Sequence, residues 1–121
     1  MQVTTEQENI ELVKRLFDSA TNLDANAIDD LLTPDFQMYS NDVNWDFKTF
    51  KDYHVENYKT RKSLEIVYHD IFCKNDRVAA RVNITLTNLD GGVHEFQVML
   101  IAQIRDQRIY HLWELTFPHW Q

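Results

Sequence analysis

Residues suited to acid–base chemistry are spread along the chain instead of forming one motif. His54 and Tyr58 stand four residues apart in a segment rich in aromatic residues, and His111, Trp113 and Glu114 lie close together near the end of the chain. In a dry pocket a histidine or a carboxylate can act as a general base, while hydroxyl and amide groups can hold the oxygen that becomes charged. These residue types favour proton transfer without a cofactor.

The candidates for chemistry are two catalytic residues and six residues that would contact a ligand. The catalytic candidates are His54 and His111, and the ligand-binding candidates are Tyr39, Tyr58, Arg81, Asn83, Trp113 and Glu114. Successive side chains of a strand point to opposite faces, so His111 and Trp113 share one face while Glu114 points to the other. These three residues therefore cannot all line one pocket.

Each candidate also has a purely structural interpretation. His54 stands among aromatic residues, where a packed core histidine with a satisfied ring nitrogen is an alternative to a catalytic base. Trp113 can equally belong to the core. Arg81 and Glu114 can pair with each other across the outer face of the sheet or at a dimer interface.

A metal or a bound cofactor is not expected. No two of the histidines His54, His69, His94 and His111 have a close ligand spacing, and the only cysteine belongs to no metal-binding motif. The only two glycines are adjacent, which leaves no glycine-rich phosphate loop and no nucleophile elbow.

The length and the net charge of the chain limit the classes of protein to which it can belong. A chain of 121 residues with 44% apolar residues can bury one core, so residues 1–121 are expected to form a single domain. The net charge of −7 argues against a nucleic-acid partner, because phosphate binding needs clustered cations. The densest basic run, Lys59, Arg61 and Lys62, is interpreted as a solvated helix end. The first residues lack the pattern of a secretory signal, so we expect a cytoplasmic protein with no membrane partner.

Helical periodicity dominates the first half of the chain. Thr5 and Glu8 form a capping-box pattern before a predicted helix over 6–21. A second, shorter helix is predicted over 25–32, and Pro34 prevents its continuation. After a short strand at 35–40 and a turn, a third helix is predicted to begin at the cap Asp46 and to run to residue 58.

Period-two alternation dominates the second half. Three breaks, at 74–77, 90–92 and 105–108, divide it into four long strands of an antiparallel meander. The apolar residues of the second of these strands are Val78, Ala80, Val82, Ile84 and Leu86, which all fall on one face. The stretch 96–102 is almost continuously apolar and is predicted to be buried on both faces. Because a helix layer covers only one face, a homodimer through the outer face of the sheet is expected.

The order of elements predicts an α+β fold with helices against one face of a long sheet. Sheets of this length curl, and helices can close one end of the curl around a blind pocket. We expect that pocket between the third helix and the concave face, lined by Tyr39, His54, Tyr58 and Trp113 with His111 near its floor.

Three short strings carry a resemblance to a known superfamily. They are Leu31-Leu32-Thr33-Pro34-Asp35-Phe36, Asn75-Asp76-Arg77-Val78-Ala79-Ala80-Arg81 and Arg108-Ile109-Tyr110-His111-Leu112-Trp113-Glu114. In this order they make the chain similar to the SnoaL-like branch of the nuclear transport factor 2-like superfamily. The resemblance implies a cystatin-like cone, in which three N-terminal helices pack on a curved antiparallel sheet that encloses a pocket.

The resemblance implies a range of activities. Members of the superfamily include polyketide cyclases, ketosteroid isomerase, scytalone dehydratase, limonene epoxide hydrolase and non-catalytic binding modules, so the fold does not decide the function. We therefore expect a pocket for a small, partly hydrophobic molecule, serving a cofactor-free isomerase, dehydratase or hydrolase. The alternative is a non-catalytic ligand-binding or dimerisation module.

The resemblance transfers only a few residues. The Arg-x-Asp pair of the epoxide hydrolase branch matches Arg81-Val82-Asn83, where an amide replaces the carboxylate, and Glu114 lies near the carboxylate of the final strand. The glycine-rich stretch of many SnoaL-like cyclases is absent at 89–94. A tryptophan on the final strand often borders the cavity in relatives, which favours His111 with Trp113 on the pocket side, whereas the epoxide hydrolase match favours Glu114.

Overall fold

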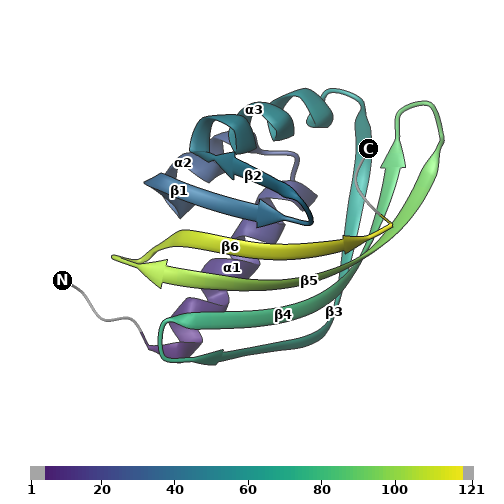
Figure 1. The fold of residues 1–121 in the computed structure, drawn as a ribbon. Helices are drawn as coiled ribbons and strands as arrows, with labels where there is room; N and C mark the ends of the chain where they lie inside the picture. Colours follow the sequence, from purple (N-terminus) through teal and green to yellow (C-terminus); the bar gives the residue numbers. More distant parts are fainter. Residues whose placement is uncertain (1–4, 119–121) are drawn as a thin grey trace.

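Three α-helices and a six-stranded sheet make up the part of the chain that the computed structural model describes, residues 5–118. The elements are α1 (Glu6–Thr21), the 3₁₀ turn η1 (Ala25–Ala27), α2 (Ile28–Leu31), β1 (Leu32–Ser40), β2 (Val43–Asp46), α3 (Phe47–Tyr58), β3 (Arg61–Lys74), β4 (Arg77–Asn88), β5 (Val93–Arg105) and β6 (Arg108–Phe117) (Figure 1). This is the predicted α+β arrangement.

The two longer helices begin where their capping residues predict. The Thr5 hydroxyl accepts a hydrogen bond from the Glu8 backbone N–H at 3.1 Å, and the Glu8 carboxylate accepts one from the Thr5 N–H at 3.0 Å. At the start of α3 the Asp46 carboxylate accepts from the Thr49 N–H at 2.8 Å. Each cap satisfies backbone donors that have no partner within the helix.

The segment after α1 differs from the prediction. The expected helix over 25–32 is a 3₁₀ turn followed by one α-helical turn, and β1 begins at Leu32, before Pro34. The proline is tolerated because the pairing of β1 with β6 is irregular between Leu32 and Gln37, where its missing N–H costs no regular ladder bond. β2 was not predicted, since only four residues pair with β1 after a turn in which Asn41 has a φ of 51°.

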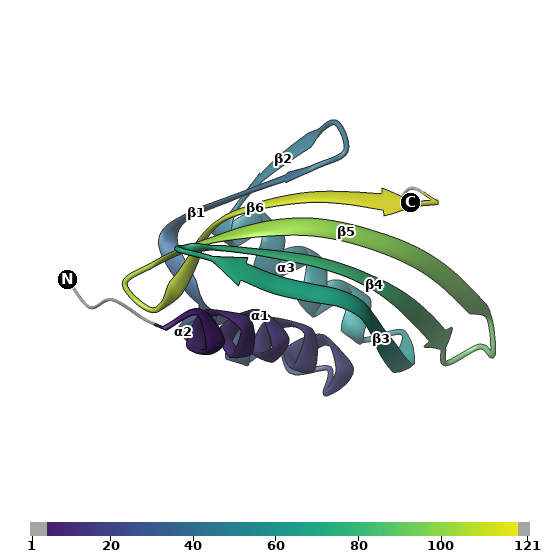
Figure 2. The same ribbon diagram turned by 90° about the horizontal axis from the view of Figure 1, so that it is seen from below.

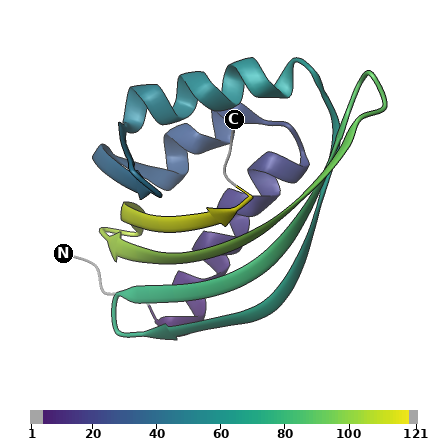
Figure 3. The ribbon, with the colours of Figure 1, turned by 45° about the vertical axis from the view of Figure 1, so that its right-hand side comes forward.

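The four long strands form the predicted antiparallel meander. The strand order is β2-β1-β6-β5-β4-β3, and β1 runs parallel to β6 while all other neighbours are antiparallel. The sheet is strongly curved, and the helices lie on its concave side (Figure 2). Figure 3 shows α3 crossing above one end of this curved sheet while α1 lies beneath its middle.

The core lies between the helices and the concave face. All five apolar residues predicted to point inward from β4, Val78, Ala80, Val82, Ile84 and Leu86, are buried. On β5 only alternate residues are buried: Val98 and Leu100 are, whereas Met99 is 55% exposed and Ile101 is 42% exposed. The prediction that this strand is buried on both faces is therefore wrong for the single chain, because the helices cover one face only. Among residues 5–118, no helix combines the length and apolar character needed to cross a membrane.

Candidate functional site

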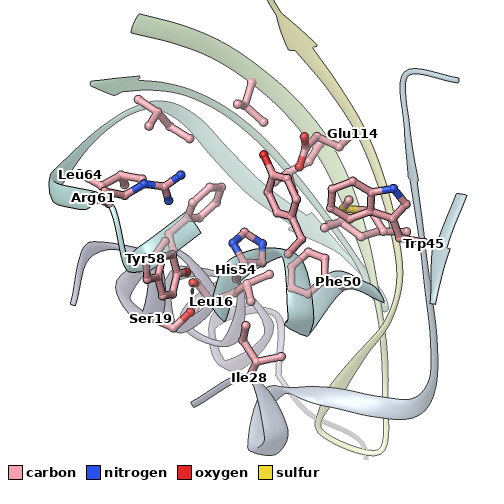
Figure 4. Close-up of a pocket in the computed structure, with 18 residues that line it drawn as sticks. Leu16, Ser19, Ile28, Trp45, Phe50, His54, Tyr58, Arg61, Leu64 and Glu114 are labelled. Atoms are coloured by element: carbon pink, nitrogen blue, oxygen red, sulfur yellow. Dashed lines mark hydrogen bonds between the residues drawn. The ribbon is translucent and has the colours of Figure 1, made fainter. Parts of the chain in front are cut away.

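A cavity of about 90 Å³ lies between α3, α1 and the concave face of the sheet (Figure 4). We call it the α3 cavity. Most of its lining is aliphatic or aromatic, and its side chains with polar groups are Ser19, Trp45, Tyr53, His54, Tyr58, Arg61 and Glu114. An apolar hollow with a few convergent polar groups is the usual form of a small-molecule site.

The spacing of α3 places a row of rings along the cavity. Phe50, His54 and Tyr58 follow one another at intervals of four residues and so lie on one helical face. The His54 ring centroid is 4.5 Å from that of Phe50 and 5.5 Å from that of Tyr58. The ring centroid of Tyr53 lies 5.4 Å from that of His54 and 4.7 Å from that of Trp45 on β2. The imidazole is thus held by aromatic neighbours.

His54 is a neutral ring with an unsatisfied nitrogen. Its Nδ1 is buried and has no hydrogen-bond partner. Burial, assisted by the positive charge of Arg61, lowers the pKa of His54 from 6.5 to about 4. At neutral pH the imidazole is therefore uncharged, with one nitrogen able to donate and the other able to accept.

The two tyrosines of the cavity remain protonated. Burial raises the pKa of Tyr58 to about 12, although the Arg61 charge and a hydrogen bond with Ser19 partly oppose this. Burial likewise raises the pKa of Tyr53. Both hydroxyls are hydrogen-bond donors at neutral pH.

Arg61 contributes a buried cation at the start of β3. The residue is only 7% exposed, its Nε is buried without a hydrogen-bond partner, and its Cζ lies 5.4 Å from the centroid of the Tyr58 ring. Burial lowers the pKa of its guanidinium. The interpretation of this basic run as a solvated helix end is wrong for Arg61, although Lys59 and Lys62 are exposed.

Glu114 lines the cavity from β6. Its Oε1 accepts hydrogen bonds from the Ser40 hydroxyl at 3.3 Å and from the Thr116 hydroxyl at 2.6 Å. Ser40 is also its register partner on the parallel strand β1, and both Ser40 and Thr116 are buried. The carboxylate is therefore fixed on the inner side of the sheet.

His111, Trp113 and Tyr39 lie on the opposite, convex side, which we call the outer face. The rings of Tyr39 and Trp113 stack with centroids 6.1 Å apart, and His111 meets Trp113 edge-on at 5.3 Å. Their expected position in the cavity is wrong. Leu112, between the two β6 aromatics, is buried against the helices, so its neighbours in sequence must point outward.

Arg81 and Asn83 also lie on the outer face. The Arg81 Nε donates to the Asp70 carboxylate at 2.9 Å, and Glu114 lines the cavity on the inner side, so the alternative in which Arg81 pairs with Glu114 across the outer face of one chain is wrong. Asn83 is exposed, because its neighbours Val82 and Ile84 occupy the inner face of β4. The Arg-x-Asn segment that matches the epoxide hydrolase pattern therefore does not reach the α3 cavity.

Three of the candidate residues from the sequence line the cavity: His54, Tyr58 and Glu114. Two further polar residues of the lining, Tyr53 and Arg61, were not among the candidates. Tyr53 could have been found, because it lies three residues after Phe50 on the same helical face. No sequence signal distinguishes Arg61 from its exposed basic neighbours. Within residues 5–118 there is no group of three or more His, Cys, Asp or Glu side chains able to hold a metal ion.

Comparison with known proteins assigns the family. A family model described as the SnoaL-like domain matches residues 13–112. The chain belongs to the SnoaL-like domain family. The resemblance inferred from the three sequence strings is thereby confirmed. No curated protein matches this SnoaL-like chain in sequence.

Solved structures share the fold of this SnoaL-like domain at low sequence identity. AclR from Streptomyces galilaeus, a proposed hydroxylase, has a TM-score of 0.82 and 18% identity, covering 93% of this chain and 90% of its own. A proposed SnoaL-like polyketide cyclase from Jannaschia sp. has a TM-score of 0.77 and 16% identity, with coverages of 97% and 92%. An LEH-like epoxide hydrolase from M. tuberculosis has a TM-score of 0.81 and 16% identity, with coverages of 92% and 84%. These matches support the α+β nuclear transport factor 2-like fold.

Proposed function

We propose that the α3 cavity binds a small, partly hydrophobic molecule and that the protein transforms it by proton transfer without a cofactor, as an isomerase, dehydratase or hydrolase. One observation carries the proposal: the buried His54 Nδ1 and Arg61 Nε both lack hydrogen-bond partners in one largely apolar cavity. Buried polar atoms without partners are costly and rare in folded proteins. A ligand that supplies both partners accounts for them.

His54 is the proposed base. It is neutral at physiological pH, and a base with a pKa near 4 can still remove a proton if the resulting oxyanion is stabilised, as the aspartate of ketosteroid isomerase does with a pKa of about 4.6. The guanidinium N–H groups of Arg61 and the hydroxyl of Tyr53 are the hydrogen-bond donors available to stabilise that oxyanion. The proton taken by the imidazole then returns to another atom of the ligand or to a leaving oxygen.

Glu114 is a second proposed base on the same cavity. Its carboxylate is held by Ser40 and Thr116, so its orientation is fixed in the way a catalytic carboxylate requires. The solved structures with the same fold include an LEH-like epoxide hydrolase and a proposed SnoaL-like polyketide cyclase, so enzymes are among the proteins that share this fold.

Proton exchange tests this function before a natural substrate is known. The protein is incubated in D₂O with small ketones such as cyclopentanone, and loss of the signal of the hydrogens next to the carbonyl is followed by NMR. We expect catalysed exchange that falls on the order of a hundredfold in His54→Phe and stays unchanged in His111→Phe, the matched change on the outer face. Exchange that survives in His54→Phe would refute the role of His54.

A non-catalytic ligand-binding module is the second candidate. It is supported by the modest size of the cavity and by the hydrogen bonds within the protein that already engage Glu114. A binding module would bind the same ketones without catalysing exchange. Wild-type protein that binds but never exchanges would favour this alternative over the enzyme.

We also propose a homodimer formed through the outer face. Large apolar side chains are exposed there, with Phe72 62%, Met99 55% and Leu115 63% exposed, and they line a shallow hollow of about 570 Å³ together with Trp113. Apolar patches of this kind usually mark an interface. Light scattering at micromolar concentration should give about twice the 14.5 kDa chain mass. The change Met99→Glu should give a monomer, and a wild-type monomer would overturn the proposal.

Some expectations from the sequence remain predictions. They are that the protein has no metal, cofactor, nucleic-acid or membrane partner and that it is cytoplasmic. Elemental analysis of protein purified without a histidine tag tests the first, and stoichiometric metal would contradict it. A gel shift at low salt tests the nucleic-acid prediction, which tight binding would overturn.

A further inference from the structure

Arg61 is a buried cation that lacks an acidic partner. None of the ion pairs formed among residues 5–118 involves it, although its side chain is almost wholly removed from water. Moving a charge into an apolar interior without compensation is strongly unfavourable, so buried arginines normally pair with a carboxylate. This arginine therefore lacks the partner that its surroundings require.

Two arginines that do form ion pairs make the contrast clear. Arg81 pairs with Asp70 at 2.9 Å and Arg105 with Asp35 at 2.7 Å, and both arginine side chains are more than 40% exposed, at 42% and 41%. Exposed cations need these partners least, because water already solvates them. Arg61 needs a partner most and has none within the described chain.

The geometry around Arg61 limits how a partner can approach. The Tyr58 ring lies over the guanidinium at 5.4 Å, and the unpartnered Nε marks the free edge of the group. Figure 4 shows the guanidinium pointing into the cavity, with Glu114 on the opposite side. Nε together with one terminal nitrogen can donate two parallel hydrogen bonds to a planar carboxylate.

We infer that Arg61 is an anion-recognition residue and that the α3 cavity takes a small monocarboxylic acid with a short apolar body. The inference rests on the proposed function only in that the cavity is a ligand site. The lining near Arg61 includes Leu64, Ile84 and Val98, which suit the apolar body. A second carboxylate on the ligand would face the negative charge of Glu114, so monoacids are preferred to diacids.

The size of the cavity bounds the apolar body. A dry protein cavity of about 150 Å³ accommodates benzene. The α3 cavity, at about 90 Å³, therefore fits a body smaller than a six-membered ring. Branched acids such as 3-methylbutanoate fit this description, whereas an acid with two fused rings does not.

A matched pair of probes tests the inference on the wild-type protein. We would titrate 3-methylbutanoate and the isosteric neutral amide 3-methylbutanamide, and record the NMR signals of arginine Nε–H groups and of histidine rings. We expect the acid to bind about tenfold or more tightly than the amide and to shift the Arg61 Nε–H and the His54 ring.

Variants separate recognition of the acid from the presence of a ligand site. Arg61→Gln should remove the preference for the acid over the amide, while Arg81→Gln, an arginine change on the outer face, should keep it. If the amide binds as tightly as the acid and still shifts His54, the acid inference is wrong but the ligand site stands. If neither probe shifts His54 or Arg61, the inference and the cavity site both fail. The wild-type titration decides the matter even if Arg61→Gln does not fold.

Discussion

Replacing His54 by phenylalanine should change how the stability of the protein depends on pH. Burial and the nearby Arg61 charge lower the pKa of His54 from 6.5 to about 4 in the folded protein. In the unfolded chain the residue titrates near its ordinary value. Between these two values the unfolded chain binds a proton at this position and the folded protein does not.

The sign and size of the effect follow from this difference. Above about pH 6.5 the imidazole is neutral in both states, and its contribution to stability is fully present. As the pH falls towards 4, the unfolded state gains protons and the folded state becomes relatively less stable. Each unit of difference between the unfolded and folded pKa of His54 corresponds to about 1.4 kcal/mol. Between about pH 6.5 and pH 4, this residue alone should therefore lower the free energy of unfolding by about 3 kcal/mol.

Urea unfolding followed by tryptophan fluorescence, between about pH 4 and pH 7, measures this loss. Phenylalanine fills similar space and does not titrate, so His54→Phe should lack this part of the acid-induced loss. At neutral pH the variant should be as stable as wild type or more so, because an unpartnered nitrogen is removed. His111→Phe, on the outer face, should keep the wild-type contribution of His54. A pH dependence identical in wild type and His54→Phe would refute the reasoning.

The remaining predictions concern stability at neutral pH and are measured by the same urea unfolding. Thr5→Ala should cost about 1 kcal/mol by removing the capping box of α1, and no loss would mean that this end of the helix is frayed in solution. Phe36→Ala should cost about 3–5 kcal/mol because the side chain is fully buried. Phe72 is 62% exposed in the single chain, so Phe72→Ala should cost under about 1 kcal/mol when it is made in the monomeric variant Met99→Glu. Equal losses for the two changes in that background would contradict the described burial.

Most of the fold could be predicted from the sequence because local patterns agree with the tertiary structure. The caps Thr5 and Asp46 mark real helix starts, and the turn sequences divide the second half into strands at the right places. What local patterns could not supply was the hairpin of β1 and β2. Its second strand is four residues long, and its polar residues resemble a loop until pairing with β1 is known.

The candidate site could be predicted only in part, because residue type does not reveal which face of a strand is buried. Alternation correctly separated Glu114 from His111 and Trp113, but the side that faces the helices is decided by Leu112 and its neighbours in the core. Aromatic rings on the outer face resemble a cavity lining in composition. Arg61 was missed for a related reason: its burial depends on how the elements around the α3 cavity pack together, which its exposed neighbours Lys59 and Lys62 do not indicate.

The position of a bound acid tests the central claim, that the α3 cavity is a ligand site, most directly. A crystal structure of the protein soaked with 3-methylbutanoate should show the carboxylate within hydrogen-bonding distance of the Arg61 Nε and the apolar body beside His54. The account would be contradicted by a structure in which the acid lies only on the outer face, or in which the side chains of the cavity close over Arg61 and leave no space for it.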